Sequence, residues 1–238
     1  MIELKDVSYI LEENGIKKII LDNISCVFDN KSLTAITGHN GSGKSTLTKI
    51  IVGLIKPTSG KVYFNGVDIT NMPINERANM GLNYAFQQPI TFSGITIKEL
   101  IDIATKDSNS ISKACEYLSK VGICAKEYIN REFDKTLSGG EQKRIELALA
   151  LAKSGECYVF DEPEAGIDLW SFEKLNNLFN KEKCNIVVSH QEKLLNKADK
   201  ILVLENGKIS HFGKTKEILK KVKNLTCGRI QGGKNEVR

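Results

Sequence analysis

The sequence predicts an α/β fold in which helices cover the faces of a mainly parallel sheet, after an antiparallel β region and around an inserted helical segment. Strand-like and helix-like segments alternate in both terminal parts of the chain, which is typical of parallel sheets. Residues 2–28 contain short alternating runs with no helical segment between them. Residues 96–131 follow a helical pattern instead, with apolar side chains on one face.

The 238 residues suit one large domain, which we expect over 1–238, with a helical subdomain inserted at about 92–140 and a basic tail at about 222–238. Alternating or β-branched runs predict strands at Ile2–Val7, Ile19–Leu21, Ile24–Phe28, Leu33–Thr37, Lys61–Phe64 and Leu82–Phe86. The pair Asn65-Gly66 predicts a turn after the fifth of these. A helix is expected from Lys44 to about Gly53, which Gly53 and Pro57 would end.

The second half begins with helices over Thr96–Arg131, interrupted by a polar loop at Lys106–Ser110. Further along, the pattern predicts helix Glu141–Lys153, strand Cys157–Phe160, helix Leu169–Asn180, strand Asn185–Ser189, a short helix and strand Ile201–Leu204. From Gly207 onward we expect a solvated helix and a frayed tail.

Composition excludes several classes of protein. Hydrophobic residues make up 41% and charged residues 26%, as in ordinary globular proteins. The longest apolar runs are about six residues, such as Leu147–Ala152, whereas a membrane-spanning helix needs about 20. No signal for secretion opens the chain, and the six cysteines show no zinc spacing, so we expect reduced thiols, no membrane insertion and a cytoplasmic location.

The charge distribution gives no sign of a nucleic-acid groove. The net charge is +5, but residues 207–238 alone hold nine Lys/Arg and two Glu, a net of +7. The remaining body is therefore slightly acidic, and it has no interleaved basic and aromatic residues. We expect no nucleic-acid partner.

One segment has the spacing of a phosphate-binding loop. The residues Gly38 to Ser45 fit G-x-x-x-x-G-K-[ST], after a predicted strand and at the start of a predicted helix. Such a loop wraps phosphates with backbone N–H groups at a helix N-terminus. We expect Lys44 to reach the β- and γ-phosphates and Ser45 to ligate Mg²⁺. The expected nucleotide-binding residues are Gly38, His39, Asn40, Gly41, Ser42, Gly43, Lys44, Ser45 and Thr46. The fold class is accordingly that of P-loop NTPases, with a RecA-like sheet.

A second chemical signal is the carboxylate pair that ends the strand at Cys157–Phe160. Ligands of open α/β sheets sit at the carboxyl ends of the strands, which places Asp161 and Glu162 beside the loop. We expect Asp161 to hold Mg²⁺ and Glu162 to act as the general base that polarises water. The alternative is that these acids form a turn that caps the next helix, and the presence of a phosphate loop in the same chain makes it the less favoured interpretation.

A GTPase interpretation has to be weighed, because Asn196-Lys197-Ala198-Asp199 matches the base-reading motif N-K-x-D. That motif should directly follow a buried strand, and here it follows a helical segment. A GTPase also needs D-x-x-G, and no Asp of this chain has Gly three residues further on. The sequence therefore disfavours GTP as the substrate.

The segment Leu137–Arg144, L-S-G-G-E-Q-K-R, closely resembles the signature motif of ABC-type ATPases. This resemblance implies ATP and Mg²⁺ as cofactors, and ATP hydrolysis as the reaction. It also implies that the signature residues Ser138, Gly139 and Gly140 contact ATP. Three further motifs of the family fall on residues of this chain. Gln87, in the Q-loop, would contact the metal and the water, and His190, after the switch strand, would contact the γ-phosphate. Asp168, in the D-loop, would contribute to the nucleotide site.

The resemblance further implies an ATP-dependent head-to-tail homodimer, in which each ATP lies between the loop of one copy and the signature of the other. The chain departs from the family near its N-terminus. Leu11 stands where many members have an aromatic residue that stacks on adenine, and Tyr9 is two residues away. We expect apolar contact to replace stacking, with Tyr9 in the core.

Two kinds of partner remain open: the scaffold of an iron–sulfur cluster assembly system, or the membrane subunit of a transporter that would hold the ATPase at the membrane. Residues 80–96 and the E-Q-K-R of the signature resemble SufC-like ATPases, which favours a SufB/SufD-like scaffold partner. Pro163, directly after Asp161 and Glu162, is instead the residue usual at this position in transporter subunits. Under both interpretations the uncharged segment Gln88–Thr96 is the expected docking surface, with Phe92 part of it; the alternative is that Phe92 packs in the core.

Overall fold

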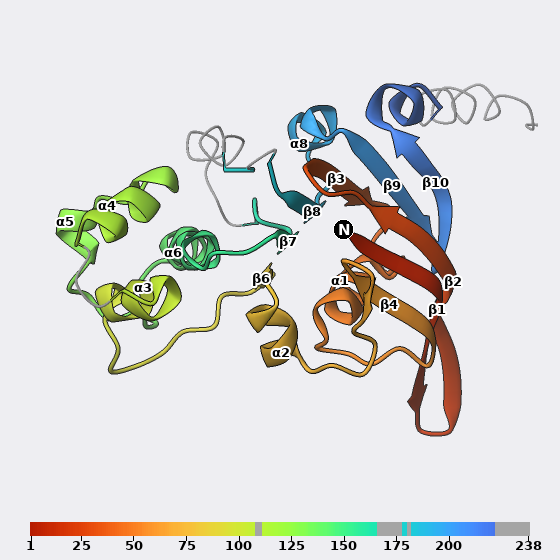
Figure 1. Cartoon of the computed structure of the whole chain (residues 1–238), viewed down its shortest axis with the longest axis horizontal. Coiled ribbons are helices and arrows are strands. Elements are labelled where there is room, and N and C mark those ends of the chain that lie inside the picture. Colours follow the sequence, from red (N-terminus) through yellow and green to blue (C-terminus); the bar gives the residue numbers. More distant parts are fainter. Residues whose placement is uncertain (108–110, 166–177, 180–181, 222–238) are drawn as a thin grey trace, which may run out of the picture.

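Two β-sheets and a group of helices make up the structure, a computed structural model that describes residues 1–107, 111–165, 178–179 and 182–221 (Figure 1). A four-stranded antiparallel sheet has the order β2-β1-β4-β5, and a six-stranded sheet has the order β10-β9-β3-β8-β7-β6. Within the six-stranded sheet all neighbours are parallel except the pair of β9 and β10. The predicted combination of an antiparallel region and a mainly parallel sheet is therefore confirmed.

The elements follow each other along the chain in an order close to the predicted one. The N-terminal half contains β1 (Ile2–Glu13), β2 (Ile16–Phe28), β3 (Ser32–Thr37), α1 (Lys44–Val52), β4 (Ser59–Phe64), β5 (Val67–Asp68), α2 (Ile74–Asn79) and β6 (Leu82–Ala85). The second half contains α3 (Ile97–Thr105), α4 (Ile111–Lys120), α5 (Ala125–Tyr128), α6 (Gly139–Ala152), β7 (Cys157–Asp161), β8 (Cys184–Val188), α8 (Glu192–Lys197), β9 (Lys200–Glu205) and β10 (Lys208–Lys214).

Three predictions about these elements were wrong or incomplete. The expected strands at 19–21 and 24–28 form one strand, β2, because Asn23 at φ 56° takes up an irregularity in its pairing with β1. Residues 208–214 form β10 rather than a helix, and helix begins only at residue 215. The turn before β10 is Asn206-Gly207, both at positive φ, which is a strong hairpin signal. The short elements α2 and β5 had no predicted counterpart.

Some predictions lie outside the described residues. These are Asp168, most of the helix expected at 169–180 and the basic tail at 222–238. Residues 178–179 are described, and they are not helical. Among the helices in the described ranges, none has both the length and the apolar character needed to cross a bilayer.

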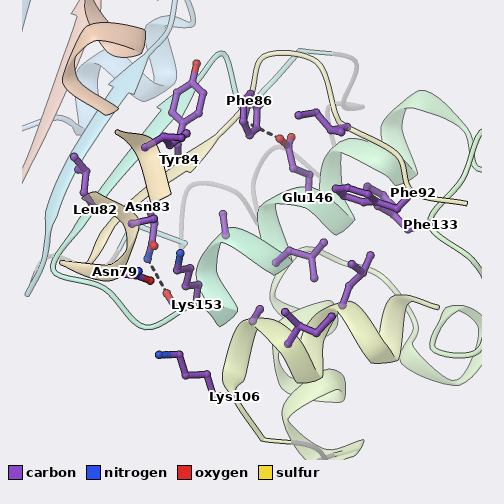
Figure 2. Close-up of a pocket in the computed structure, with 18 residues that line it drawn as sticks. Asn79, Leu82, Asn83, Tyr84, Phe86, Phe92, Lys106, Phe133, Glu146 and Lys153 are labelled. Carbon is purple, nitrogen blue, oxygen red and sulfur yellow. Dashed lines mark hydrogen bonds between the residues drawn. The ribbon is translucent and has the colours of Figure 1, made fainter. Parts of the chain in front are cut away.

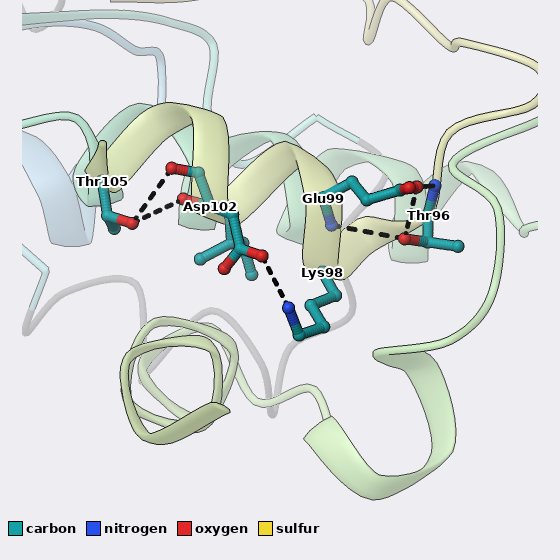
Figure 3. Close-up of polar contacts among 6 residues, drawn as sticks. Thr96, Lys98, Glu99, Asp102 and Thr105 are labelled. Atoms are coloured by element: carbon teal, nitrogen blue, oxygen red, sulfur yellow. Dashed lines mark hydrogen bonds and ion pairs between the residues drawn. The ribbon is translucent and has the colours of Figure 1, made fainter. Parts of the chain in front are cut away.

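The helices α3 and α6 begin at matching caps. At α3 the Thr96 hydroxyl accepts from the Glu99 N–H, and the Glu99 carboxylate accepts from the Thr96 N–H at 2.8 Å (Figure 3). One turn later an ion pair of 2.6 Å joins Lys98 to Asp102. Ser138 and Glu141 form the same capping box at α6, so local sequence sets both helix starts.

The central strands β3, β8 and β7 of the six-stranded sheet are buried on both faces, as parallel sheets require. In β7, Phe160 faces a core shared with α3, α4 and α6, whereas Val159 faces a second core that includes α1 and the antiparallel sheet. Figure 1 shows the helices α3–α6 on one side of the six-stranded sheet and the antiparallel sheet on the other. The carboxyl ends of β3, β7 and β8 thereby meet at one edge, beside the start of α1.

Candidate nucleotide-binding site

The predicted phosphate loop connects the central strand β3 to α1. Its glycines are required by the backbone and by close neighbours. Gly43 caps α1 at φ 100°, and a Cβ there would lie 2.7 Å from a methyl group of Leu21. At Gly38 a Cβ would lie 2.0 Å from the carbonyl oxygen of Leu204. No side chain fits at either position, so the loop packs against both sheets through bare backbone.

Lys44 is folded back over this loop. Its Nζ donates hydrogen bonds of 2.9 Å to the carbonyl oxygens of both Gly38 and His39. Burial lowers the pKa of Lys44, while the nearby carboxylates of Glu162 and Asp161 oppose that shift. The Oγ of Ser42 is buried in the same loop and has no hydrogen-bond partner among the described residues. A buried donor without an acceptor beside a fixed ammonium group suits an anionic ligand.

Asp161 lies at the centre of a set of hydroxyl groups. Its carboxylate is fully buried and accepts from Ser45 Oγ at 3.3 Å, Thr48 Oγ1 at 3.3 Å and the Tyr84 hydroxyl at 3.1 Å. Burial raises the pKa of Asp161, and the hydrogen bonds from Tyr84 and Thr48 lower it. The structure thus brings two of the three predicted metal residues, Ser45 and Asp161, within hydrogen-bonding distance of each other.

Thr48 and Tyr84 were missed at the level of sequence. Thr48 lies three residues after Ser45, so both hydroxyls point from the same face of α1, and this spacing was a usable signal. Tyr84 belongs to β6, which pairs with β7 in parallel. Nothing local to Tyr84 indicates that its strand neighbours Asp161.

Glu162 and Gln87 meet across the same edge. The Nε2 of Gln87 donates a hydrogen bond of 2.9 Å to Glu162 Oε2. Glu162 itself has φ 48°, in the left-handed region, and its N–H donates to the carbonyl of Val188 at the end of β8. A left-handed residue after a buried strand turns its side chain away from the strand direction, here toward the predicted Q-loop glutamine.

His190 follows β8 and is exposed at the same edge. Burial lowers its pKa, the positive charge of Lys44 lowers it further, and Glu162 raises it. The lowered pKa favours the neutral imidazole, which can accept as well as donate a hydrogen bond.

The signature residues lie apart from the phosphate loop. Ser138 is the N-cap of α6 and its N–H donates to the Glu141 carboxylate at 2.7 Å. Gly139 and Gly140 open the helix, and a Cβ on Gly139 would meet nothing within 4 Å. Within the described ranges no hydrogen bond or ion pair joins residues 138–140 to residues 38–46. Gly139 and Gly140 are the first two residues of the helix, so their backbone N–H groups have no partner within it and can bind a ligand from outside this chain.

Leu11, at the position expected to contact adenine, and Tyr9 both lie in β1. Leu11 is half-buried in β1, paired with Lys18 of β2. Tyr9 packs against the core that includes α1 and the antiparallel sheet. It therefore serves packing, as expected.

A largely apolar groove of about 490 Å³ opens next to this site (Figure 2). It runs between α2 and β6 on one side and α3 and α6 on the other. Its lining includes Ile74, Ile90, Phe92, Leu100, Ile103 and Phe133. Phe92 is 45% exposed although its N–H donates to the Phe133 carbonyl at 2.8 Å, and Ile103 is 68% exposed. Phe92 is thus anchored through its backbone while its ring faces the groove.

Comparisons with known proteins agree with this architecture. Residues 21–165, more than half of the chain, match the family model described as ABC transporter. The chain is 36% identical over 211 residues to the uncharacterized ABC transporter ATP-binding protein MJ0035 of Methanocaldococcus jannaschii, covering 84% of each protein. It is 31% identical over 238 residues to the energy-coupling factor transporter ATP-binding protein EcfA2 of Caldanaerobacter subterraneus subsp. tengcongensis, covering 94% of this chain and 82% of EcfA2.

Two further similarities extend this picture. The iron–sulfur cluster assembly protein SufC of Plasmodium falciparum is 31% identical over 234 residues, which cover 90% of this chain and 66% of SufC. A solved dimer of the ATP-binding cassette MJ0796, in a post-hydrolysis state with ADP and Pi, superposes with a TM-score of 0.81 at 25% identity, over 90% of this chain and 99% of that one. The chain therefore belongs to the ABC transporter family and is an ATP-hydrolysing cassette.

Proposed function

We propose that this chain is the ATP-binding subunit of a membrane transporter and that its partner docks in the apolar groove beside Gln87. The observation that supports this most is the similarity to transporter ATP-binding proteins, EcfA2 among them, over most of the chain. The SufC-like role that the sequence motifs favoured has less support from the comparisons than the transporter role does. The groove itself is exposed, apolar and adjacent to the candidate site, as a docking surface for an apolar helix requires.

The second candidate function is the ATPase of an iron–sulfur cluster scaffold. The similarity to Plasmodium SufC supports it, together with the acidic–basic residues Glu141 and Lys143 of the signature segment. The partner would then be a soluble SufB/SufD-like scaffold rather than a membrane protein. The groove would serve either partner, so the two functions differ in what it binds.

The proposed chemistry uses the residues that meet at the edge of the sheet. Mg²⁺ prefers oxygen ligands, and the Ser45 hydroxyl, the Asp161 carboxylate and the Gln87 amide oxygen provide them. When bound with ATP, the ion would neutralise charge on the β- and γ-phosphates. Lys44 would bind the same phosphates, and the loop N–H groups would fix their orientation.

Glu162 is the proposed general base. Its carboxylate accepts a hydrogen bond of 2.9 Å from the Gln87 amide, which would orient the base toward the attacking water. His190, which follows β8 at the same edge of the sheet, would contact the γ-phosphate. Ser138, Gly139 and Gly140 of a second copy would close the site, because among the described residues no hydrogen bond or ion pair joins them to the phosphate loop of their own chain. Asp168, which lies outside the described residues, is proposed to contribute as well.

A photocrosslinking experiment distinguishes the two candidate partners. A photoreactive amino acid at Ile103 would probe the groove, and the same group at Ile16, 73% exposed on the hairpin of β1 and β2, would be the matched control. We expect an adduct from position 103 with an integral membrane protein in the native host. An adduct with a soluble scaffold would support the second function. Equal labelling at both positions would argue against docking in the groove.

A further inference from the structure

Helix α6 buries two charged side chains, Lys143 and Glu146, among apolar neighbours. Lys143 is 1% exposed and Glu146 is 8% exposed, and their Nζ and Oε2 atoms lie 3.4 Å apart. Lysine and glutamate are almost never buried unless they are paired. Even then, removing both charges from water is so costly that an apolar pair of similar size is often as stable. Packing alone does not account for these two residues.

Their remaining hydrogen bonds all go to one short piece of backbone at the end of β6. Lys143 Nζ donates to the carbonyl oxygen of Phe86 and, at 3.2 Å, to that of Gln87. Glu146 Oε1 accepts from the N–H of Phe86 at 2.7 Å, and this bond is drawn in Figure 2. Three backbone groups of two consecutive residues are therefore fixed by a helix that is distant in sequence.

The fixed backbone is the one from which Gln87 reaches Glu162. The side chain of Gln87 leaves the chain at a point whose carbonyl is held by Lys143, and its Nε2 lies 2.9 Å from Glu162 Oε2. Burial raises the pKa of Glu146, and the charge of Lys143 opposes that shift. A shift of this backbone by about 1 Å would move the amide away from the base.

We propose that Lys143 and Glu146 are positioning residues for hydrolysis: they hold the backbone of Phe86 and Gln87 so that the Gln87 amide faces Glu162. The inference rests on the proposed roles of Gln87 and Glu162. Through these hydrogen bonds α6, the helix capped by Ser138, contacts the backbone that carries Gln87. Glu146 also lines the groove, so the same pair borders the expected docking surface.

A double-mutant cycle on the full-length protein tests this inference. Lys143→Met should lower kcat for ATP roughly 10- to 100-fold, as for a misplaced catalytic group, and leave KM within about threefold. Gln87→Ala should lower kcat as well. If Lys143 acts through Gln87, the variant with both changes should be no slower than the slower single variant, because the effects of coupled residues do not add.

A second pair of variants separates positioning from folding. Lys143→Met with Glu146→Leu replaces the ion pair by apolar side chains. Removing the desolvation cost of the two charges offsets part of the loss of three backbone hydrogen bonds, and urea denaturation would establish that the variant is folded under the assay conditions. Turnover should nevertheless stay low. Glu146→Gln keeps an acceptor for the Phe86 N–H and should lose less activity than Glu146→Ala. Lys120→Met breaks the exposed Lys120–Glu116 pair of α4 and serves as the matched control with parental kcat.

Several outcomes would overturn the inference. One is parental turnover in the folded apolar pair, and another is a Lys143→Met effect that multiplies with that of Gln87→Ala. Parental turnover in Gln87→Ala would show that Gln87 does not contribute to hydrolysis, so Lys143 could not act through it. Glu162→Gln reports separately on the proposed function: if it is inactive while the cycle is multiplicative, the hydrolytic site stands and only the positioning role fails.

Discussion

The Tyr84 hydroxyl donates a 3.1 Å hydrogen bond to Asp161 Oδ2 across the neighbouring parallel strands β6 and β7. Burial raises the pKa of Tyr84 and the carboxylate raises it further, so the phenol stays protonated and donates. Ser45 and Thr48 of α1 complete the set of donors around the same carboxylate. A buried acid on the central sheet is thus stabilised by uncharged hydroxyls, two of which belong to the helix that follows the phosphate loop.

Tyr84→Phe should lower the free energy of unfolding by about 1 kcal/mol, the usual net contribution of one hydrogen bond, because Asp161 keeps its other two donors. Urea denaturation monitored by circular dichroism would measure it. Tyr9→Phe, on a ring that packs against a core, is the matched control with a smaller expected change. Identical midpoints for Tyr84→Phe and the parent would show that the bond contributes nothing.

Glu162→Gln should abolish turnover and preserve ATP binding. The change is nearly isosteric, keeps Asp161 and the phosphate loop, and removes the proposed base, whose loss typically slows reactions by roughly 10²–10⁴-fold. It should also trap an ATP-bound dimer. Phosphate release and nucleotide binding would be measured in parallel. Turnover within about threefold of the parent would contradict the assignment of Glu162 as general base.

Specific ATPase activity should rise with protein concentration. The phosphate loop and Ser138 lie on separate elements with no bond between them among the described residues, so a complete site needs a second copy. Activity per subunit would be assayed from nanomolar to micromolar protein, with sedimentation at each concentration. A constant value in a range where the protein sediments as a monomer would argue against a shared site.

Phe92→Ala should weaken partner binding by about 2 kcal/mol or more, as expected for a hot-spot aromatic, and leave nucleotide affinity unchanged. The ring is 45% exposed, and only its backbone is bonded to Phe133. Partner-stimulated ATPase activity should fall with affinity. A drop of several degrees in melting temperature with unchanged partner affinity would instead identify Phe92 as a core residue.

Arg77→Met should be strongly destabilising. The guanidinium is 1% exposed and donates to the carbonyls of Met72, Ile50, Ile51 and Thr70 at 2.7–3.1 Å. Burial lowers its pKa to about 10. Because each buried carbonyl left unpaired costs roughly 1–3 kcal/mol, we expect a loss of about 3 kcal/mol or more in urea unfolding. Arg77→Lys should fall between Met and the parent, since one ammonium cannot reach all four oxygens.

Within the described residues, several expected elements were found where a continuous run of residues encodes them. The phosphate loop follows β3 and opens α1, and the capping boxes at Thr96 and Ser138 start α3 and α6. The hairpin of β9 and β10 was missed although Asn206-Gly207 signals it, because the charge of the last residues drew the interpretation toward a solvated helix. The Asn-Gly pair determines the local backbone here, whereas the high charge of the residues that follow does not.

The sequence by itself determined the phosphate loop, the acids that end β7 and the signature at α6, because each is a contiguous motif whose spacing fixes its own backbone geometry. Only the tertiary structure decided that Tyr84 bonds Asp161 and that Lys143 holds Gln87. These contacts depend on β6 lying beside β7 and on α6 packing over its end. Strand order and helix placement follow from burial summed over the whole chain, and no local pattern records which distant residues that burial brings together.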